Sequence, residues 1–213
     1  MKNILAKFQL LWLLKSPPAL FSRLFGLRWY RAMLELWVAP LLKPNARVLE
    51  IGCAGGDFAR ALAAQNMEVW AVDRSPNMIA RAQQTPGPVK FKQADVMQLP
   101  YPDRHFDIVL AASLINVVDA PLAALAEMCR VCRAGGTVSV VVPDLAFTDA
   151  DATRYLEAER LDGFSRTAFL AWHQRARKME IDILLGYFRD CCTTNITTTL
   201  LLGGMVVAIS GEV

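Results

Sequence analysis

The sequence is short of the residues that metal centres and disulfide frameworks require. Its 213 residues include only two histidines, His105 and His173, and five cysteines. An odd number of cysteines without regular spacing argues against a disulfide framework. A zinc site needs a second correctly spaced pair or nearby histidines, and the Cys129–Cys132 pair has neither. We therefore expect no metal, and cysteines that are buried thiols in a reducing compartment.

Long apolar runs are also missing. A membrane-spanning helix needs about 20 nearly uninterrupted apolar residues, and no stretch has that character. The N-terminus resembles the basic start of a signal peptide, but Lys15 ends the apolar run early and no small-residue cleavage pattern follows. We therefore reject secretion and expect a cytoplasmic protein. The hydrophobic share is nevertheless 54%, which favours contact with a membrane surface or with an apolar substrate.

Neither sign of charge is in large excess, since the net charge is only +3. This is too little to indicate nucleic acid, no Asn-Pro-Pro-Tyr-type motif is present, and the basic residues stand beside aromatic and leucine faces. We expect no nucleic-acid partner. The positive residues before the first acid, Glu35, are Lys2, Lys7, Lys15, Arg23, Arg28 and Arg31.

Residues 1–42 are predicted to form helices split by a Ser-Pro-Pro segment. In residues 1–15 an apolar face is flanked by lysines, which suits either a helix lying on a membrane or a packed cap. For residues 19–40 we favour the cap, with Trp29, Met33, Leu36 and Trp37 turned away from the charged face. The predicted division is a helical cap over 1–42 and one domain over 43–213, located in the cytoplasm, and on the inner face of the membrane if residues 1–15 bind it.

From residue 43 apolar strands alternate with helices, which indicates a parallel sheet covered on both faces. The predicted strands cover residues 47–51, 68–72, 89–93, 106–111 and 137–142. Helices are predicted over 57–65, 76–84 with Ser75 as N-cap, and 121–133, and residues 144–190 read as helical. A hairpin over 196–202 and 205–210 closes the chain.

The first strand runs into a glycine-rich turn, Glu-Ile-Gly-Cys-Ala-Gly-Gly-Asp, between Glu50 and Asp57. Single acids, Asp73 and Asp95, then end the next two strands. A turn bared by glycine lets backbone N–H groups approach a ligand, and acids at strand ends can hold a ribose and a base. This order indicates a site for an adenosine-containing ligand.

The same residues resemble class I methyltransferases that depend on S-adenosylmethionine (SAM), of the methyltransferase domain 11 type. Their acid-x-Gly-x-Gly-x-Gly pattern is met by Glu50, Gly52 and Gly56, with Ala54 in the middle position. That substitution costs little if the backbone at Ala54 keeps a negative φ, and matters if the position is left-handed. The fold implied is α/β and Rossmann-like: a seven-stranded, mostly parallel sheet with a C-terminal antiparallel hairpin, helices on both faces and extra N-terminal helices.

The resemblance also implies a cofactor, SAM, with S-adenosylhomocysteine as product, and a set of residues that bind it. An acid at Asp73 holds the ribose hydroxyls, Asp95 accepts from the adenine amino group, and carbonyls after the fourth strand meet the methionine amine. The complete set is Glu50, Gly52, Cys53, Ala54, Gly55, Gly56, Asp73, Arg74, Met78, Asp95, Val96, Ala111, Ala112 and Ser113.

Two further segments resemble the ubiquinone and menaquinone C-methyltransferases: Asn-Val-Val-Asp from Asn116 and Leu-Leu-Gly-Gly-Met-Val from Leu201. Ile115, however, stands where that family has arginine. The implied acceptor is a small hydrophobic or membrane-associated molecule, such as a quinone precursor or a phospholipid headgroup. No residue is marked as catalytic base. Asn116 and Ser113 are candidates for orienting a substrate oxygen, and His173 for a role above the acceptor, although capping or a satisfied helix position explains each as well.

Three alternatives stay open. One is methylation of a soluble small molecule, and another is methylation of arsenite bound by the thiolates of Cys191 and Cys192. The third is a SAM-binding subunit without chemistry of its own, whose N-terminal helices dock a partner. A homodimer is also left open.

Overall fold

The computed structural model describes residues 23–191 and 194–213, so the predictions for residues 1–15, for the Ser-Pro-Pro segment and for Cys192 lie outside it. The strands are β1 Arg47–Ile51, β2 Glu68–Asp73, β3 Lys90–Gln93, β4 Phe106–Ala112, β5 Cys132–Pro143, β6 Thr194–Leu201 and β7 Val206–Glu212. The α-helices are α3 Arg28–Val38, α4 Asp57–Ala63, α5 Pro76–Ala82, α6 Pro121–Val131, α7 Asp149–Ala158, α8 Gly163–Arg175 and α9 Ile181–Cys191. The 3₁₀ turns are η1 Ala39–Leu41 and η2 Leu202–Gly204.

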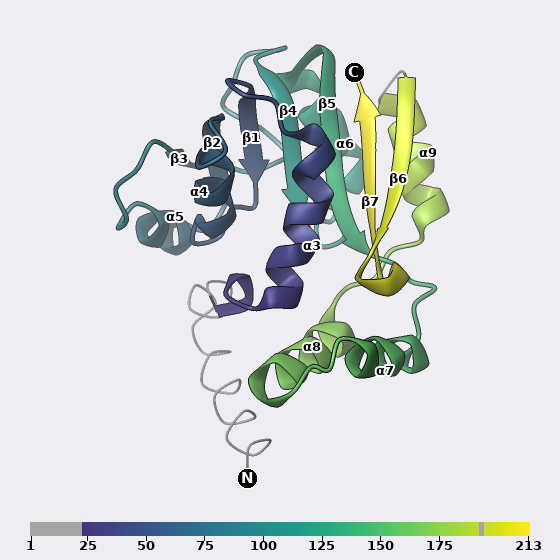
Figure 1. Ribbon diagram of the computed structural model, residues 1–213. Helices are drawn as coiled ribbons and strands as arrows, with labels where there is room; N and C mark the ends of the chain where they lie inside the picture. The colour runs from purple at the N-terminus through teal and green to yellow at the C-terminus, as the bar shows by residue number, and fades with distance from the viewer. Residues whose placement is uncertain (1–22, 192–193) are drawn as a thin grey trace.

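These strands form one seven-stranded sheet with the order β3-β2-β1-β4-β5-β7-β6. The first five strands in this order pair in parallel, and β7 lies antiparallel between β5 and β6 (Figure 1). The order reverses between β1 and β4, and in open α/β sheets ligands bind beyond the carboxyl ends of the strands at such a point. The predicted fold class, a mostly parallel sheet with a closing antiparallel hairpin, is confirmed.

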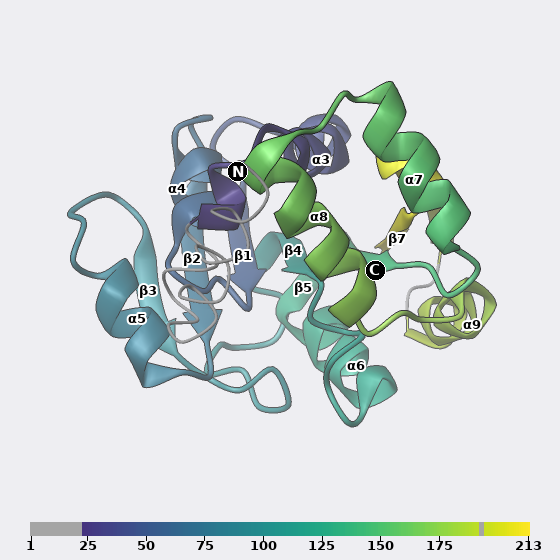
Figure 2. The ribbon, with the colours of Figure 1, turned by 90° about the horizontal axis from the view of Figure 1, so that it is seen from below.

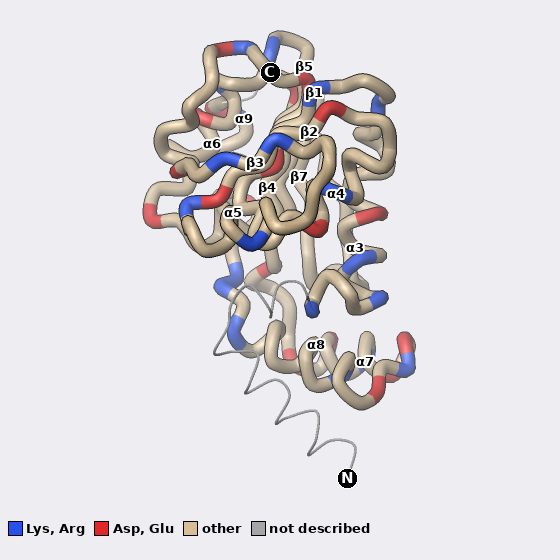
Figure 3. The backbone as a smooth tube through the Cα atoms, turned by 90° about the vertical axis from the view of Figure 1, so that its left-hand side faces the viewer, with Lys and Arg blue, Asp and Glu red and all other residues tan. Residues whose placement is uncertain are grey.

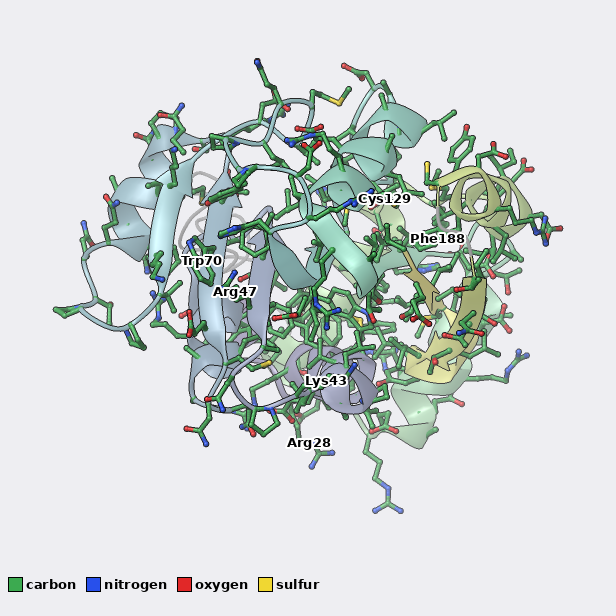
Figure 4. All side chains as sticks on the ribbon, turned by 90° about the horizontal axis from the view of Figure 1, so that it is seen from above. Arg28, Lys43, Arg47, Trp70, Cys129 and Phe188 are labelled. Carbon is green, nitrogen blue, oxygen red and sulfur yellow. The ribbon has the colours of Figure 1, made fainter. Side chains whose placement is uncertain are left out.

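The sheet separates two apolar clusters, because successive side chains of a strand point to opposite faces. On β1, Val48 belongs to the cluster under α3 and α4, while Leu49 and Ile51 belong to the cluster under α6 and α9. Figure 4 shows Cys129 of α6 and Phe188 of α9 on the same side of the sheet, and both are buried there. Helices therefore cover both faces, which is why the central strand β4 is almost entirely apolar, whereas the edge strand β3 reads Lys-Phe-Lys-Gln.

Helix α3 is fixed to the sheet. Its residues Trp29, Met33 and Trp37 are buried as expected, whereas Leu36 is 64% exposed. The indole Nε1 of Trp37 donates a 2.7 Å hydrogen bond to the hydroxyl of Ser139, a buried residue of β5. This bond satisfies the buried indole N–H of Trp37, while the Ser139 hydroxyl also lies 2.7 Å from the hydroxyl of Ser210. The packing holds α3 against the same core as β1 and β4.

Helices α7 and α8 lie below the sheet, beyond the carboxyl ends of the parallel strands (Figures 1 and 2). Thr148 begins α7 with a capping box, in which its side chain and that of Asp151 bond each other's backbone N–H groups. Trp29 of α3 contacts α8 edge-to-face at Phe169, with ring centroids 5.1 Å apart. The three helices therefore enclose the end of the sheet where the site is predicted.

Strand β5 differs from the prediction, since it begins at Cys132 and not at Thr137. Gly135 and Gly136, which precede the predicted strand 137–142, lie within β5, and the pairing of β5 with β4 shifts register between Phe106 and Ile108. A Cβ on Gly136 would lie 2.7 Å from the sulfur of Cys132 and 2.9 Å from the carbonyl oxygen of Asp107. These glycines thus serve a close approach of backbones inside an irregular strand.

Positive and negative side chains are interspersed along the chain (Figure 3). Several of them pair, as Arg130 does with Asp103 and Glu127 and Arg133 does with Asp107. No helix among the described residues is long and apolar enough to cross a membrane. Nor do the described side chains include a cluster of three or more metal-ligating groups.

Candidate cofactor site

The turn after β1 is held in a conformation that most side chains avoid. Gly52, Ala54 and Gly56 have φ values of +79°, +45° and +79°. The N–H groups of Gly52 and Cys53 both donate to the carbonyl of Val72 on β2, at 2.8 and 3.0 Å. The turn therefore curls over the carboxyl end of the sheet. A Cβ on Gly56 would lie 2.5 Å from the ring of Phe91, so glycine is needed there for space as well as for φ.

Ala54 occupies the unfavourable one of the two conformations considered for it. Its φ of +45° is left-handed. Alanine in place of the family's middle glycine would have cost little only with a negative φ. A left-handed conformation costs a residue with a Cβ about 1–2 kcal/mol. The backbone N–H of Ala54 donates to Oδ2 of Asp73 at 2.9 Å, and this bond holds the strained residue in place.

Asp73 joins the turn to β2. Its Oδ2 accepts from Ala54, and its Oδ1 accepts from the N–H of Ser75 at 2.9 Å. Ser75 in turn caps α5, as predicted, by accepting from the N–H of Met78 at 3.4 Å. A carboxylate accepts about four hydrogen bonds, so each oxygen of Asp73 keeps one lone pair for a ligand. Asp73 is thus suited both to hold the turn and to bind a pair of hydroxyls.

Asp95 and Glu50 present the other carboxyl groups. Oδ1 of Asp95 accepts from the N–H of Met97 at 2.9 Å, and the residue is exposed beside the cavity. Glu50 is only 4% exposed, and its Oε2 is buried without a hydrogen-bond partner among the described residues. Burial first, and then the negative charge of Asp73, raise the pKa of Glu50 to about 8. A buried acid with an unused oxygen needs a ligand to satisfy it.

One cavity of about 390 Å³ connects these groups. Its volume falls in the range of about 300–1,000 Å³ typical of small-molecule sites. Every predicted cofactor residue except Gly56 and Ala111 lines it: Glu50, Gly52, Cys53, Ala54, Gly55, Asp73, Arg74, Met78, Asp95, Val96, Ala112 and Ser113. Gly56 begins α4 behind the turn, and Ala111 is fully buried in β4.

The cavity also has a wall that the sequence patterns did not assign to it. Phe25, Tyr30 and Leu34 line it from the N-terminal helical region, and Leu114, Val117 and Val118 line it from the loop after β4. Tyr30 and Leu34 are four residues apart on α3, so their shared face was visible in the sequence. Its partner was not, because only the tertiary packing brings α3 to the glycine turn.

The candidates for a role in catalysis separate in the structure. Ser113 lines the cavity, with a φ of +51°. Asn116 is buried outside the residues that line it, and its amide donates to the carbonyl of Arg177 at 2.7 Å. His173 is 4% exposed and faces away from the cavity, since its Nε2 lies 2.8 Å from Oδ1 of Asp149. Of the three, only Ser113 shares the cavity with the predicted cofactor residues.

Comparison with known families identifies the domain that carries this site. Residues 49–140 match the methyltransferase domain family. This stretch of the chain is therefore similar to a methyltransferase domain. The match begins inside β1 and ends inside β5, so it includes Glu50, the glycine turn, Asp73 and Asp95.

Characterised relatives are similar over this region. A phosphatidylethanolamine N-methyltransferase from Cereibacter sphaeroides is 40% identical over 103 residues, which are 46% of this chain and 50% of that protein. A demethylmenaquinone methyltransferase from Beutenbergia cavernae is 32% identical over 112 residues, 53% of this chain and 45% of that protein. The chain thus spans about half the length of the curated relatives it matches.

Solved structures share the fold over nearly the whole chain. A SAM-dependent methyltransferase from Thermotoga maritima superposes with a TM-score of 0.65 at 23% identity, covering 90% of this chain and 94% of that one. A SAM-dependent methyltransferase from Aquifex aeolicus gives 0.64 at 15% identity, covering 89% and 92%. At these identities the likeness establishes the Rossmann-like methyltransferase fold.

The residues present fit SAM, the cofactor that this family implies. The unpartnered oxygen of Glu50 suits the ammonium group, the spare lone pairs of Asp73 suit the two ribose hydroxyls, and Asp95 suits the adenine amino group. All three acids line the same cavity. The assignment of individual residues to parts of the cofactor stays a prediction.

Proposed function

We propose that the protein transfers a methyl group from SAM to a small hydrophobic or membrane-associated acceptor, of the quinone-precursor or phospholipid-headgroup class. The observation that carries the proposal is the composition of the cavity. Four acids line it, Glu50, Asp57, Asp73 and Asp95, and an apolar wall lines it too, formed by Phe25, Leu34, Leu114, Val117 and Val118. An apolar wall favours an apolar acceptor, because each buried methylene contributes about 0.8 kcal/mol to binding. The relatives named for phosphatidylethanolamine and demethylmenaquinone support the same class.

The protein's contribution to the reaction is positioning. When bound, SAM supplies an activated methyl group, so much of the rate comes from holding the acceptor in line with it and from excluding water. Val117 and Val118 follow the strand end at Ser113, and α3 provides the facing apolar residues. These groups orient an acceptor by its shape and its apolar surface.

The described residues that line the cavity do not include histidine, the side chain most often used as a base, and they do not include lysine either. Burial first, and then the charge of Glu50, raise the pKa of the Cys53 thiol far above its usual range, so it stays protonated. A base is needed only when the nucleophile arrives protonated. A protonated acceptor would therefore lose its proton to a lining carboxylate or to water.

The test is methyl transfer by the purified full chain from SAM carrying a labelled methyl group. Acceptors are a demethylated quinol and phosphatidylethanolamine, each in vesicles, and a panel of water-soluble amines, phenols and carboxylates. We expect label in the organic phase with a vesicle-borne acceptor. The variant Val117→Glu should lower that transfer at least tenfold while S-adenosylhomocysteine still binds. Label on soluble acceptors alone would contradict the proposed acceptor class.

The alternatives are outcomes of the same assay. Transfer to arsenite that disappears in the Cys191→Ser variant would favour arsenite bound by the thiolates of Cys191 and Cys192. Cys192 lies outside the described residues. Binding of S-adenosylhomocysteine without transfer to any acceptor would favour a subunit that lacks chemistry of its own. Membrane contact through residues 1–15 is tested by flotation with anionic vesicles of the full chain and of a chain lacking those residues. If neither chain floats, that contact is absent.

A further inference from the structure

Tyr30 reaches the cofactor cavity from outside the matched domain, which begins at residue 49. Its place on α3 is fixed from two sides. Trp37, two turns further along the helix, is bonded to Ser139 of β5. Trp29, the neighbour of Tyr30, is buried and meets Phe169 of α8 at a ring-centroid distance of 5.1 Å. The tyrosine is therefore held at a defined point of the cavity wall.

The Tyr30 hydroxyl is available to a ligand. It makes no hydrogen bond with another residue in the described part of the chain, although the side chain is partly buried and lines the cavity. Burial first, and then the charge of the Glu50 carboxyl, raise the pKa of Tyr30 to about 12. The phenol is thus a neutral donor at physiological pH, and Glu50 is near enough to influence it.

Two residues that line this cavity carry polar groups without a hydrogen-bond partner among the described residues. They are Tyr30, whose hydroxyl can donate, and Glu50, whose buried Oε2 can accept. An α-amino acid carries a cation and an anion on the same carbon, so it can satisfy both at once. Phe25 and Leu34 surround Tyr30 with apolar surface, which strengthens such a bond by excluding water.

We propose that Tyr30 is a cofactor-binding residue, whose hydroxyl donates to the carboxylate of the amino-acid end of SAM while Glu50 receives its ammonium. The inference rests on the proposed function, since it needs SAM in this cavity. It assigns the N-terminal helix a part in cofactor binding as well as in the acceptor wall. Loss of α3 would then weaken cofactor binding even if the matched domain stayed intact.

The test separates the carboxylate from the rest of the ligand. Calorimetry compares the full chain and its Tyr30→Phe variant with two ligands, S-adenosylhomocysteine and S-adenosyl-3-thiopropylamine, which keeps the ammonium and lacks only the carboxylate. A hydrogen bond to a charged group contributes about 1.5–3 kcal/mol. We expect Tyr30→Phe to weaken binding of S-adenosylhomocysteine about tenfold or more, and to leave binding of the amine analogue unchanged.

Phenylalanine keeps the ring that contacts Trp29, and urea unfolding confirms that the variant is folded. Should it not fold, Tyr30→Leu is taken through the same titrations. Tyr155→Phe is the matched control, because Tyr155 is a partly buried tyrosine of α7 stacked on Phe169 and outside the cavity lining. Equal effects of Tyr30→Phe on both ligands, or no effect on either, would overturn the assignment. Failure of the unaltered chain to bind S-adenosylhomocysteine would instead refute the proposed function.

Discussion

Replacing Glu50 by glutamine should change how stability depends on pH. The side chain keeps its shape but can no longer ionise. In the folded protein, burial raises the pKa of Glu50 from 4.5 to about 8, with Asp73 adding to the effect. Between these two pH values the unfolded chain has lost the Glu50 proton while the folded chain keeps it. Folding is therefore favoured at the acid end of this range and loses stability as the pH rises towards 8.

The size of the effect follows from the same two values. Each pH unit in this range changes the free energy of unfolding by about 1.4 kcal/mol, which amounts to at most about 5 kcal/mol between pH 4.5 and pH 8. Water entering the cavity beside Glu50 reduces the full value. We therefore expect the variant to lack a decline of about 2–5 kcal/mol that the unaltered chain shows.

The assay is urea unfolding of both proteins, without ligand, at intervals from about pH 5 to about pH 9. The quantity of interest is the difference in unfolding free energy between Glu50→Gln and the unaltered chain, which should rise with pH and level off above about 8. Glu157→Gln, at an exposed position of α7, is the control and should run parallel to the unaltered chain. A difference that stays constant over the whole range would refute the argument that Glu50 is buried with an unsatisfied oxygen.

Three further predictions concern the fold around the site and are checked by urea unfolding. Ala54→Gly should stabilise the protein by about 0.5–1 kcal/mol, because glycine removes the left-handed strain. The greater entropy of glycine in the unfolded chain offsets part of this gain. No gain at all would mean that Ala54 is unstrained. Gly56→Ala should destabilise it by about 2 kcal/mol or more, since the new Cβ meets the ring of Phe91 at a φ of +79°. Trp37→Phe should cost about 1–2 kcal/mol for the lost bond to Ser139, and much less in a Ser139→Ala background; equal costs in both would show that the bond is unimportant.

The fold was largely predictable from the sequence because local patterns determine most of it. Strand β1 lies where predicted, and Ser75 caps α5 as its Ser-Pro signature indicates. The start of β5 was not predictable in the same way. A Gly-Gly pair usually signals a turn, but here both glycines lie inside β5, and Gly136 allows the strand to pass close to the carbonyl oxygen of Asp107. Sequence alone does not show such a neighbour.

The same distinction between local patterns and tertiary neighbours applies to the site. Its cofactor side follows the chain order of turn, Asp73 and Asp95, which a parallel sheet brings to one edge, so the motif was sufficient to place these residues together. Tyr30 was missed because nothing local distinguishes a helix face that packs on the sheet from one that lines a cavity. His173 was considered because it stands in the segment expected to lie above the acceptor, yet its pairing with Asp149 depends on how α8 meets α7.

The bond from Trp37 to Ser139 bears on how this enzyme class diversifies. Different segments of the chain line the nucleotide side of the cavity and its other half. The bond from the Trp37 indole joins these segments. Under the proposed function, exchanging the residues before β1 for those of a relative would change the acceptor side of the cavity, and an indole at position 37 would still be needed to bond Ser139.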